Sequence, residues 1–219
     1  VASGNGGRVR ISVSTAFGEH VLMPMMPKLR RLLPDVRFDL LVTDDRLDLA
    51  KEGIDIAIRL GVDVGEESIA ARVGDIRYVL CAAPDWAAGT PVPVHPIGFS
   101  AIDCLRYSIP GLRDAWVFGG GPAQEVGPVS GTLDGSSPSA MRAAALQGLG
   151  PAVLAHWLVQ KDLKDGRLVD LMPGQAVRPG TSTERSGIWL VYPSRDYLPT
   201  RVRRTLDILG QEIRSVTRI

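Results

Sequence analysis

The chain has 219 residues, of which 45% are hydrophobic, and a formal net charge of +1. It is long enough to bury a sizeable core in one large or two small domains. The near-neutral charge provides no strong field for nucleic acid, and the lack of any run of about 18 apolar residues argues against a membrane-spanning segment. Two cysteines, Cys81 and Cys104, are too few for a disulfide scaffold, so buried free thiols in a reducing cytoplasm are favoured over a single bridge. Because the chain begins at Val1 without methionine, we expect a fragment or a processed product.

The first part of the chain predicts alternating strands and helices. Residues 1–7 are rich in glycine and are expected to be a linker remnant, whereas residues 8–14 alternate apolar and polar side chains as a strand does. A helix is expected over 19–33, where Pro24 and Pro27 must kink it or confine its regular part to one end. Its apolar residues cover more than one face, so it needs a second burial surface. A partner subunit and the chain's own core are both open as that surface.

The stretch LDLAKEGIDIAIRLG combines a helix pattern with a strand pattern. Helix formers at 47–52 are followed by Gly53, which suits the left-handed position after a helix, and isoleucines then alternate as a strand over 54–58. Arg59 would stand at the carboxyl end of this strand, the edge where open α/β sheets bind ligands. Together with a strand expected at 36–42, the order strand, helix, strand, helix, strand predicts parallel strands with right-handed crossovers.

The second part of the chain predicts further strands and helices. Ser137 is the expected N-cap of a helix over 140–148, with Pro138 at its first position, and a glycine-rich turn predicts a hairpin over 116–129. The other expected elements are strands at 77–83 and 102–108, an irregular connection at 87–100, a short strand at 151–154, a helix at 156–164, a strand at 167–172, a polar loop at 173–187, a strand at 188–192 and a last helix at 200–213.

Hydroxyl side chains precede two of the predicted helices. Ser14 and Thr15 follow the first strand, and Ser136, Ser137 and Ser139 precede the helix of the second part. Hydroxyls and the free N–H groups of a helix start can bind an anion, and an ordinary helix cap is the alternative. If the two starts face each other, they could hold a carboxylate or another small polar ligand.

No catalytic or metal site is predicted. His20, His95 and His156 are scattered, with no carboxylate or cysteine at metal-ligand spacing. The glycine run at 119–121 lacks the lysine and hydroxyl of a phosphate loop, and the chain has no GxSxG segment. The paired carboxylates Asp44-Asp45 are interpreted as a solvated loop. We therefore expect neither an enzyme nor a bound cofactor.

The segment DLAKEGIDIAIRLG resembles part of the effector-binding domain of LysR-type transcriptional regulators. Five further segments resemble the family in the same order, from Arg8 to about Leu209, and six segments in the right order are together specific. These further segments are RVRISVSTAFGEHVLMPMMPKLRRLLPDV, RYVLCAAPDW, AWVF, MRAAALQGLGPAVLAHWLV and WLVYPSRDYLPTRVRRTLDIL.

The resemblance implies a fold and a domain organisation. The fold would be α/β, with two Rossmann-like subdomains joined by two crossover strands, as in type 2 periplasmic binding proteins. Subdomain I would span 8–76 and 191–219, and subdomain II would span 77–190. A winged helix-turn-helix DNA-binding domain would precede Val1, outside this chain, and the protein would be bacterial and cytoplasmic.

The resemblance also implies an effector cleft between the two subdomains. For individual positions, plain structural roles remain the alternatives: a structural Arg59, a loop serine at Ser100, core packing for Phe17 and a turn end at Pro151. The loop DGSSPSAM departs from the asparagine-rich form that is more usual in the family. The expected effector-binding residues are Ser14, Thr15, Phe17, Arg59, Gly61, Ser100, Ser136, Ser137 and Pro151.

Dimerisation is a further implication of the resemblance. The helix at 20–33 and the strand at 36–42 would pack against the helix at 139–149 of a partner subunit. The expected interface residues are Met25, Leu29, Leu32, Leu41, Met141 and Ala145.

The predicted function is therefore that of an effector-binding and oligomerisation domain of a DNA-binding transcriptional regulator. It would act as a homodimer or tetramer, contact DNA only through the preceding domain, contact no membrane, and respond to its ligand by a shift in the population of two arrangements. One alternative is a periplasmic solute-binding protein for a small anionic or polar ligand, which would carry an export signal upstream. The other is an enzyme on the same scaffold acting on a small carboxylate, which would need a pocket acid, base or nucleophile with a perturbed pKa.

Overall fold

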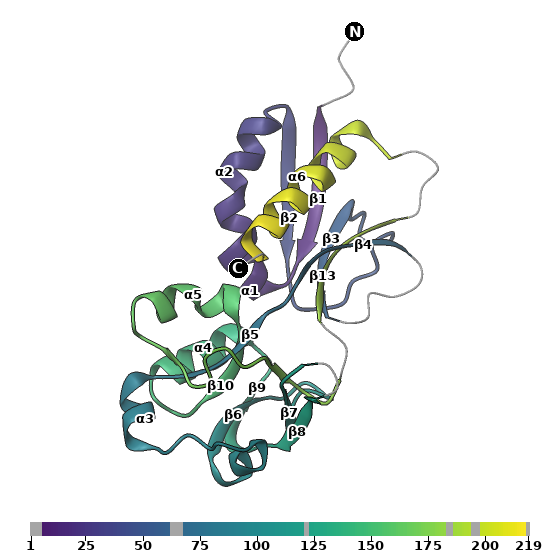
Figure 1. Cartoon of the computed structure of the whole chain (residues 1–219). Helices are drawn as coiled ribbons and strands as arrows, with labels where there is room; N and C mark the ends of the chain where they lie inside the picture. Colours follow the sequence, from purple (N-terminus) through teal and green to yellow (C-terminus); the bar gives the residue numbers. More distant parts are fainter. Residues whose placement is uncertain (1–5, 62–67, 121–122, 183–185, 194–197, 218–219) are drawn as a thin grey trace. The chain divides into compact units, whose positions relative to one another are not determined.

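The alternating apolar residues of the first predicted strand form β1, an inner strand of a five-stranded sheet of order β2-β1-β3-β13-β4 (Figure 1). β1 (Gly7–Val13) lies between β2 (Val36–Val42) and β3 (Ile56–Gly61) and is parallel to both. β13 (Gly187–Pro193) and β4 (Ser68–Asp75) complete the sheet beyond β3, and β13 runs antiparallel to both of its neighbours. The prediction of parallel strands in the first part of the chain is thus confirmed.

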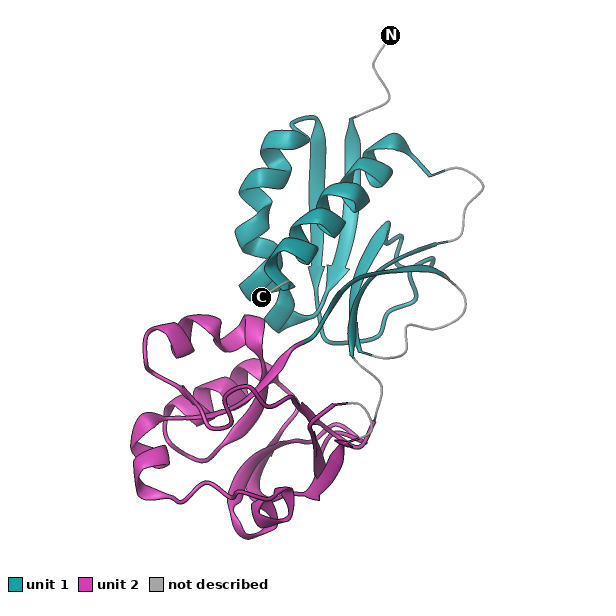
Figure 2. Cartoon of the chain, viewed as in Figure 1, with its two compact units in different colours: residues 1–76, 185–219 teal, residues 77–184 magenta. Residues whose placement is uncertain are grey.

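The chain forms two compact units (Figure 2). Unit 1 comprises Val1–Ile76 and Arg185–Ile219, and unit 2 comprises Arg77–Glu184. The chain returns from unit 2 to unit 1 before β13, so β13 belongs wholly to the unit 1 sheet. The boundary expected from the sequence lies later, after Leu190. The computed structural model describes residues 6–61, 68–120, 123–182, 186–193 and 198–217.

Most of the predicted linker, at 1–7, lies outside the described residues. Its last residue, Gly7, is the first residue of β1 and has a φ of 126°, in the region that favours glycine. The sheet therefore begins one position before the predicted strand.

One continuous helical segment follows β1, and its character changes along its length. It begins as α1 (Thr15–Phe17), earlier than predicted, passes through a π-helical turn, η1 (Gly18–Leu22), and continues as α2 (Met23–Leu32). The wider turn lies directly before Pro24, whose ring lacks an N–H and would clash with the preceding turn of a regular α-helix. The predicted disturbance by proline therefore takes the form of a π-helical turn.

The helix predicted at 47–52 is wrong, because this segment forms only one capped turn. At its start, Oδ1 of Asp48 accepts hydrogen bonds from the N–H groups of Ala50 and Lys51, at 2.9 and 3.1 Å. At its end, Gly53 has a φ of 60° and the N–H of Ile54 donates to the carbonyl of Leu49 at 2.8 Å. The predicted role of Gly53 as a C-cap glycine is confirmed, but a start and a stop so close together leave no room for a helix.

The last helix of the chain, α6 (Thr200–Thr217), packs against the unit 1 sheet and extends beyond its predicted end. It also contacts α2, where Nζ of Lys28 lies 2.6 Å from Oε1 of Glu212. The side chains of β1 beneath these helices are fully buried, so this face of the sheet holds the main core of unit 1. The buried residues of α6 are Val202, Thr205, Leu209, Gly210 and Ile213.

Unit 2 contains a five-stranded sheet of order β11-β5-β10-β6-β9 and a three-stranded sheet of order β12-β7-β8. The predicted hairpin is confirmed as the antiparallel pair β7 and β8. The strand bounds are β5 (Tyr78–Ala82), β6 (Asp103–Tyr107), β7 (Ala115–Phe118), β8 (Glu125–Pro128), β9 (Ser130–Gly135), β10 (Ala152–Ala155), β11 (Val169–Asp170) and β12 (Val177–Pro179).

The helices of unit 2 include two that agree with the sequence analysis, α4 (Pro138–Leu146) and α5 (His156–Lys164). The irregular connection predicted at 87–100 instead contains the end of α3 (Pro84–Gly89) and most of η2 (Pro96–Ala101), a 3-10 helix. The loop predicted at 173–187 likewise contains β12. Short elements of this kind are held by tertiary pairing, which local residue patterns do not reveal.

Aromatic side chains fill the core of unit 2. Phe99 lies with its ring centroid 5.5 Å from that of Trp116 and 5.3 Å from that of Phe118. Cys81 and Cys104 are free and buried, as expected, and burial raises the pKa of each thiol to about 12. Both thiols are therefore protonated at neutral pH and are poor nucleophiles.

Candidate functional site

Two of the predicted site residues lie on neighbouring segments of unit 1. Val13 of β1 and Ile58 of β3 are partners in the parallel register, and Ser14 and Arg59 directly follow them. Thr15 then opens the helical segment. Ser14 thus lies just beyond the carboxyl end of β1, whereas the expectation that Arg59 stands at the end of its strand is wrong, because β3 continues to Gly61 and Arg59 pairs with Trp189 within the sheet.

The hydroxyl of Ser14 is buried and has no hydrogen-bond partner among the described residues. Ser14 stands at the N-cap position of α1, yet its side chain makes no capping hydrogen bond. The N–H of Thr15 is bound instead by Oδ1 of Asp44, at 3.0 Å. A buried hydroxyl without a partner costs roughly 1–3 kcal/mol, so Ser14 Oγ is a group that a polar ligand would satisfy favourably.

Asp44 is a site residue that the sequence analysis missed, since it was interpreted as part of a solvated loop. It follows β2, and the N–H of Thr43 donates to the carbonyl of Val13 at 3.0 Å, which brings the end of β2 beside Ser14. A carboxylate just beyond a strand parallel to β1 is the signal that could have identified it. Because Asp44 already places a negative charge at the start of the helix, a second anion at Thr15 would be repelled.

Arg59 is partly buried, and its Nη2 donates to the carbonyl of Leu47 at 3.3 Å. Burial lowers its pKa, with a further contribution from the positive charge of Arg46. An arginine stays protonated even so. Arg59 thus supports the loop at Leu47 and keeps a positive charge beside the end of β1.

Phe17 and Gly61 have structural roles in unit 1. Phe17 is fully buried, so the expectation that it forms an apolar wall of the effector site gives way to its alternative, core packing. Gly61 has a φ of 132°, which favours glycine, and its carbonyl accepts a hydrogen bond from Nε1 of Trp189 at 3.1 Å.

The hydroxyl-rich start of α4 differs from that of α1. Ser137 is the N-cap, and its side chain accepts a hydrogen bond from the N–H of Ala140 at 3.3 Å, which confirms the predicted cap. Ser136 is exposed, and the hydroxyl of Ser139 is buried with no partner among the described residues. The start of α4 therefore keeps two hydroxyls that capping does not use.

Ser100 and Pro151 do not join the serines of α4. β6 and β9 are parallel, so the loop at Ser136 follows the carboxyl end of β9. Ser100 lies in η2, before the opposite end of β6, and its Oγ donates to the carbonyl of Ile97 at 2.7 Å. Pro151 is buried, and its carbonyl accepts a hydrogen bond from the N–H of Leu105 at 2.9 Å. Both residues therefore fit the alternatives of a loop serine and a residue that ends a turn.

The orientation of α4 is held by a buried ionic cluster. Asp162 of α5 is 0% exposed, and its Oδ1 lies 2.8 Å from Nη2 of Arg142 on α4. Arg167 also contacts this carboxylate, with Nη2 2.5 Å from Oδ1. One buried carboxylate thus ties α4, α5 and the following turn together.

The six residues expected at a dimer interface differ in how much surface they have. Met25, Leu29, Met141 and Ala145 are at most 6% exposed, so within one chain they are core residues with almost no surface for a partner. Leu32 is 41% exposed, and Leu41 is partly exposed. The interpretation that the helix at 20–33 needs a second burial surface therefore rests on Leu32 and on Met23, which is also 41% exposed.

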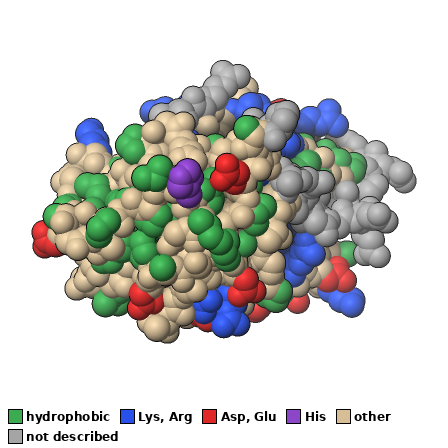
Figure 3. Space-filling model, turned by 60° about the horizontal axis from the view of Figure 1, so that its bottom comes forward, with side chains coloured by type: hydrophobic (Ala, Val, Ile, Leu, Met, Phe, Trp, Pro, Cys, Tyr) green, Lys and Arg blue, Asp and Glu red, His purple; other side chains and the backbone are tan. Residues whose placement is uncertain are grey.

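Among the described residues of unit 2, several apolar side chains are more than half exposed. Val94, Ile97, Leu149 and Val126 are 83%, 63%, 57% and 52% exposed, and Leu149 lies at the end of the helix expected at 139–149 in the interface. On the face shown in Figure 3, hydrophobic side chains gather in several groups, while most lysine and arginine side chains lie at its margins. These groups are separate, so they form no single broad apolar patch.

Within the described part of the chain, no group of three or more His, Cys, Asp or Glu side chains could hold a metal ion. No helix in these residues is long and apolar enough to cross a membrane.

Comparison with known proteins gives a consistent result. A family model described as the LysR substrate binding domain matches residues 2–214. The chain is 30% identical over 211 residues to the HTH-type transcriptional regulator DmlR of Escherichia coli (strain K12), covering 94% of this chain and 65% of that protein. It is 28% identical over 205 residues to the HTH-type transcriptional activator TtdR of the same strain, covering 93% of this chain and 64% of that protein. The chain thus spans somewhat less than two thirds of the length of these relatives.

A solved structure agrees with these relatives. The regulatory domain of CrgA, a LysR-type transcriptional regulator from Neisseria meningitidis, matches with a TM-score of 0.80 and 25% identity. The match covers 94% of this chain and 98% of that domain.

Proposed function

The chain belongs to the LysR substrate binding domain family, and we propose that it senses a small-molecule effector for a transcriptional regulator. The resemblance predicted from six segments is confirmed, as is the α/β fold of the type 2 periplasmic-binding-protein class. An effector-binding regulatory domain is the function that these relatives support. A periplasmic solute-binding protein is not favoured, because the curated relatives are named as transcriptional regulators.

The observation that carries the proposed site is the buried hydroxyl of Ser14, which has no hydrogen-bond partner within the described residues. Its position beyond the carboxyl end of β1, between two parallel neighbours, supports a ligand contact there. The hydroxyl of Ser139, also without a partner in the described ranges, and the exposed Ser136 support a second contact at the start of α4. The cleft predicted from the family resemblance remains a prediction, as do contacts to Thr15, Arg59 and Ser137.

The charged and polar groups at the starts of α1 and α4 indicate which chemical class of effector would bind. At Ser14, the adjacent Asp44 carboxylate favours a neutral or hydrogen-donating group of the ligand over an anionic one. A carboxylate of the same ligand would find less repulsion at the α4 start, because no acidic residue lies in the first turn of that helix. A small hydroxy acid or amino acid carries both kinds of group.

For the intact protein, the proposal extends to its assembly and its action. A DNA-binding domain outside this chain would be coupled to the effector through the population of two arrangements of the units. Dimerisation or tetramerisation would transmit that change, with Leu32 and Leu41 as the predicted interface residues that keep surface. The protein would act in the cytoplasm and carry out no catalysis, as the names of the curated regulators suggest.

The proposal is tested by measuring the melting temperature of the chain in the presence of hydroxy acids, amino acids and aromatic acids. A ligand at one hundred times its dissociation constant adds about 2.7 kcal/mol, and each kcal/mol raises the midpoint of a domain of this size by roughly 2–4 °C. The shift should shrink in Ser14→Ala and persist in Ser215→Ala, a matched change of a serine whose hydroxyl donates to Glu212 within α6. A shift that survives Ser14→Ala in full would contradict the proposed site.

A further inference from the structure

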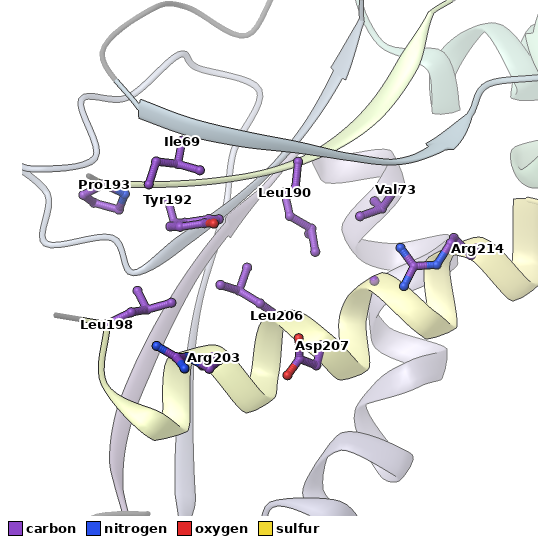
Figure 4. Close-up of a pocket in the computed structure, with 12 residues that line it drawn as sticks. Ile69, Val73, Leu190, Tyr192, Pro193, Leu198, Arg203, Leu206, Asp207 and Arg214 are labelled. Atoms are coloured by element: carbon purple, nitrogen blue, oxygen red, sulfur yellow. The ribbon is translucent and has the colours of Figure 1, made fainter. Parts of the chain in front are cut away.

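One side of α6 faces a hollow instead of the core of unit 1 (Figure 4). Most of its buried residues pack onto the sheet, whereas the neighbouring face of the helix, which includes the buried Gly210, borders a cavity of about 450 Å³. The α6 residues that line this cavity recur at spacings of three and four, as one face of a helix requires. They are Arg203, Leu206, Asp207, Gly210 and Arg214. We call the cavity the α6 groove.

The opposite wall of the α6 groove is the β4–β13 edge of the unit 1 sheet. Leu190 of β13 is the register partner of Ala71 on β4, and Tyr192 is the partner of Ile69. These side chains line the groove, so they stand on the same face of the two strands. The wall is therefore apolar across the strand pair, and Leu198 lies at one end of the groove, beside the start of α6 (Figure 4).

Small residues line both walls of the groove. Ala71 is the smallest side chain in the strand wall. On the helix, a Cβ atom at Gly210 would lie 3.4 Å from both Nη atoms of Arg214 and 3.5 Å from Cγ1 of Val73. These are ordinary contact distances, so the guanidinium of Arg214 lies close to the helix at Gly210 and near the apolar side chain of Val73.

The arginines of α6 differ in whether they have a partner among the described residues. In the described residues, Arg201 and Arg204 donate to the carbonyls of Arg8 and Leu32. Arg203 and Arg214 have no hydrogen-bond or ion-pair partner in the part of the chain that the structure describes. They lie toward opposite ends of the groove, with Asp207 between them (Figure 4). The groove therefore carries an excess of positive charge.

We propose that the α6 groove is a second small-molecule site, which binds an anion with a flat or aliphatic apolar body and a carboxylate. Its volume lies in the range of small-ligand pockets, and an apolar lining with a few polar groups is typical of them. The carboxylate would pair with Arg214, because guanidinium groups bind carboxylates in a bidentate way and Asp207 offsets the charge of Arg203 four positions earlier. The site uses β4, β13 and α6, whereas the proposed effector contacts use the end of β1 and Arg59 of β3.

The test uses 2-naphthoate as the probe and 2-naphthamide as its neutral counterpart. In ¹H–¹⁵N correlation spectra of the chain, 2-naphthoate should shift resonances of 69–73, 190–193 and 203–214, and 2-naphthamide should bind about tenfold more weakly. Shifts confined to other residues, no saturable shift at all, or equal binding of the two probes would overturn the proposal. This readout is independent of the proposed effector site, whose residues lie outside these ranges.

Variants sharpen the same measurement. Arg214→Gln should weaken 2-naphthoate about tenfold and leave 2-naphthamide unchanged, whereas Arg30→Gln, which removes an exposed arginine from α2, should change neither. Ala71→Leu should fill the groove and abolish binding of both probes, while its spectrum still shows the dispersed resonances of a folded chain. If Ala71→Leu unfolds the chain, Arg214→Gln decides alone: retention of wild-type affinity for 2-naphthoate would overturn the proposal.

Discussion

The starts of α1 and α4 carry the same kind of sequence and use it in opposite ways. At α4, the hydroxyl of Ser137 caps its own helix by accepting from the N–H of Ala140. At α1, the carboxylate of Asp44 binds the N–H of Thr15, and the hydroxyl of Ser14 is left buried without a partner in the described residues. A serine before a helix is thus a structural cap in one unit and an unsatisfied polar group in the other.

The difference shows where binding capacity resides. A capping hydroxyl already has a hydrogen bond, so a ligand gains little by contacting it. A buried hydroxyl without a partner offers the ligand a full hydrogen bond. We therefore expect loss of the Ser137 hydroxyl to cost stability and loss of the Ser14 hydroxyl to cost affinity.

The largest expected effect concerns the anchor of α4. Asp162→Ala should destabilise unit 2 by about 3–5 kcal/mol, because it leaves Arg142 without its buried carboxylate partner. Urea denaturation measures this loss. Asp165→Ala, which removes a surface carboxylate paired with Lys161, is the control and should stay near the wild-type midpoint. Equal stability of the two variants would mean that α4 is held by packing alone.

Alkaline pH is expected to destabilise unit 2 more than unit 1, because both buried thiols belong to unit 2. The folded pKa of each is raised to about 12 from an ordinary value of 9.0. The raised pKa therefore contributes stability that is present below about pH 9 and is lost as pH rises toward 12. Circular dichroism of Trp116 in the near ultraviolet should report this loss, and Cys81→Ala should reduce its steepness.

Thiol reactivity checks the same burial at neutral pH. A thiol-specific disulfide reagent should label neither Cys81 nor Cys104 in the native chain and both in guanidinium chloride. Rapid native labelling of either thiol would show that the core of unit 2 opens much more readily than its burial implies.

Ser137→Ala should cost about 1 kcal/mol, the usual loss when a capping side chain is removed. Ser137→Asp should retain most of the stability, because aspartate also caps a helix and suits its positive end. Thermal denaturation distinguishes the two variants. A similar loss in both would mean that Ser137 acts through packing instead of the hydrogen bond to Ala140.

Ser14→Ala should leave stability unchanged or slightly increased, since it removes a buried hydroxyl that has no partner in the described residues. Asp44→Ala, at the same helix start, should cost roughly 0.5–1 kcal/mol through the lost cap. If Ser14→Ala lost as much unfolding free energy as Ser137→Ala, the two serines would not differ as the structure implies.

Local chemistry made some of these features predictable. The cap at Ser137, the proline after it and the role of Gly53 each depend on residues a few positions apart, and the structure confirms them. The helix expected at 47–52 failed for a local reason as well, since Asp48 and Gly53 start and stop a single turn.

Other features depend on tertiary contacts that no local pattern contains. The hydrogen bond from Thr15 to Asp44 joins segments that follow the neighbouring strands β1 and β2, and the burial of Phe17, Met25 and Met141 depends on what packs over them. The apolar spacing of such residues identifies a buried face, but it does not distinguish the chain's own core from a partner subunit.

The central claim is that the hydroxyl of Ser14 contacts the effector. The most direct measurement is isothermal titration of the strongest ligand from the thermal panel into the wild-type chain and Ser14→Ala. We predict about tenfold weaker binding in the variant, equivalent to the loss of one hydrogen bond of about 1.4 kcal/mol, at an unchanged melting temperature. Equal affinity in the two proteins would contradict the account and place the effector elsewhere.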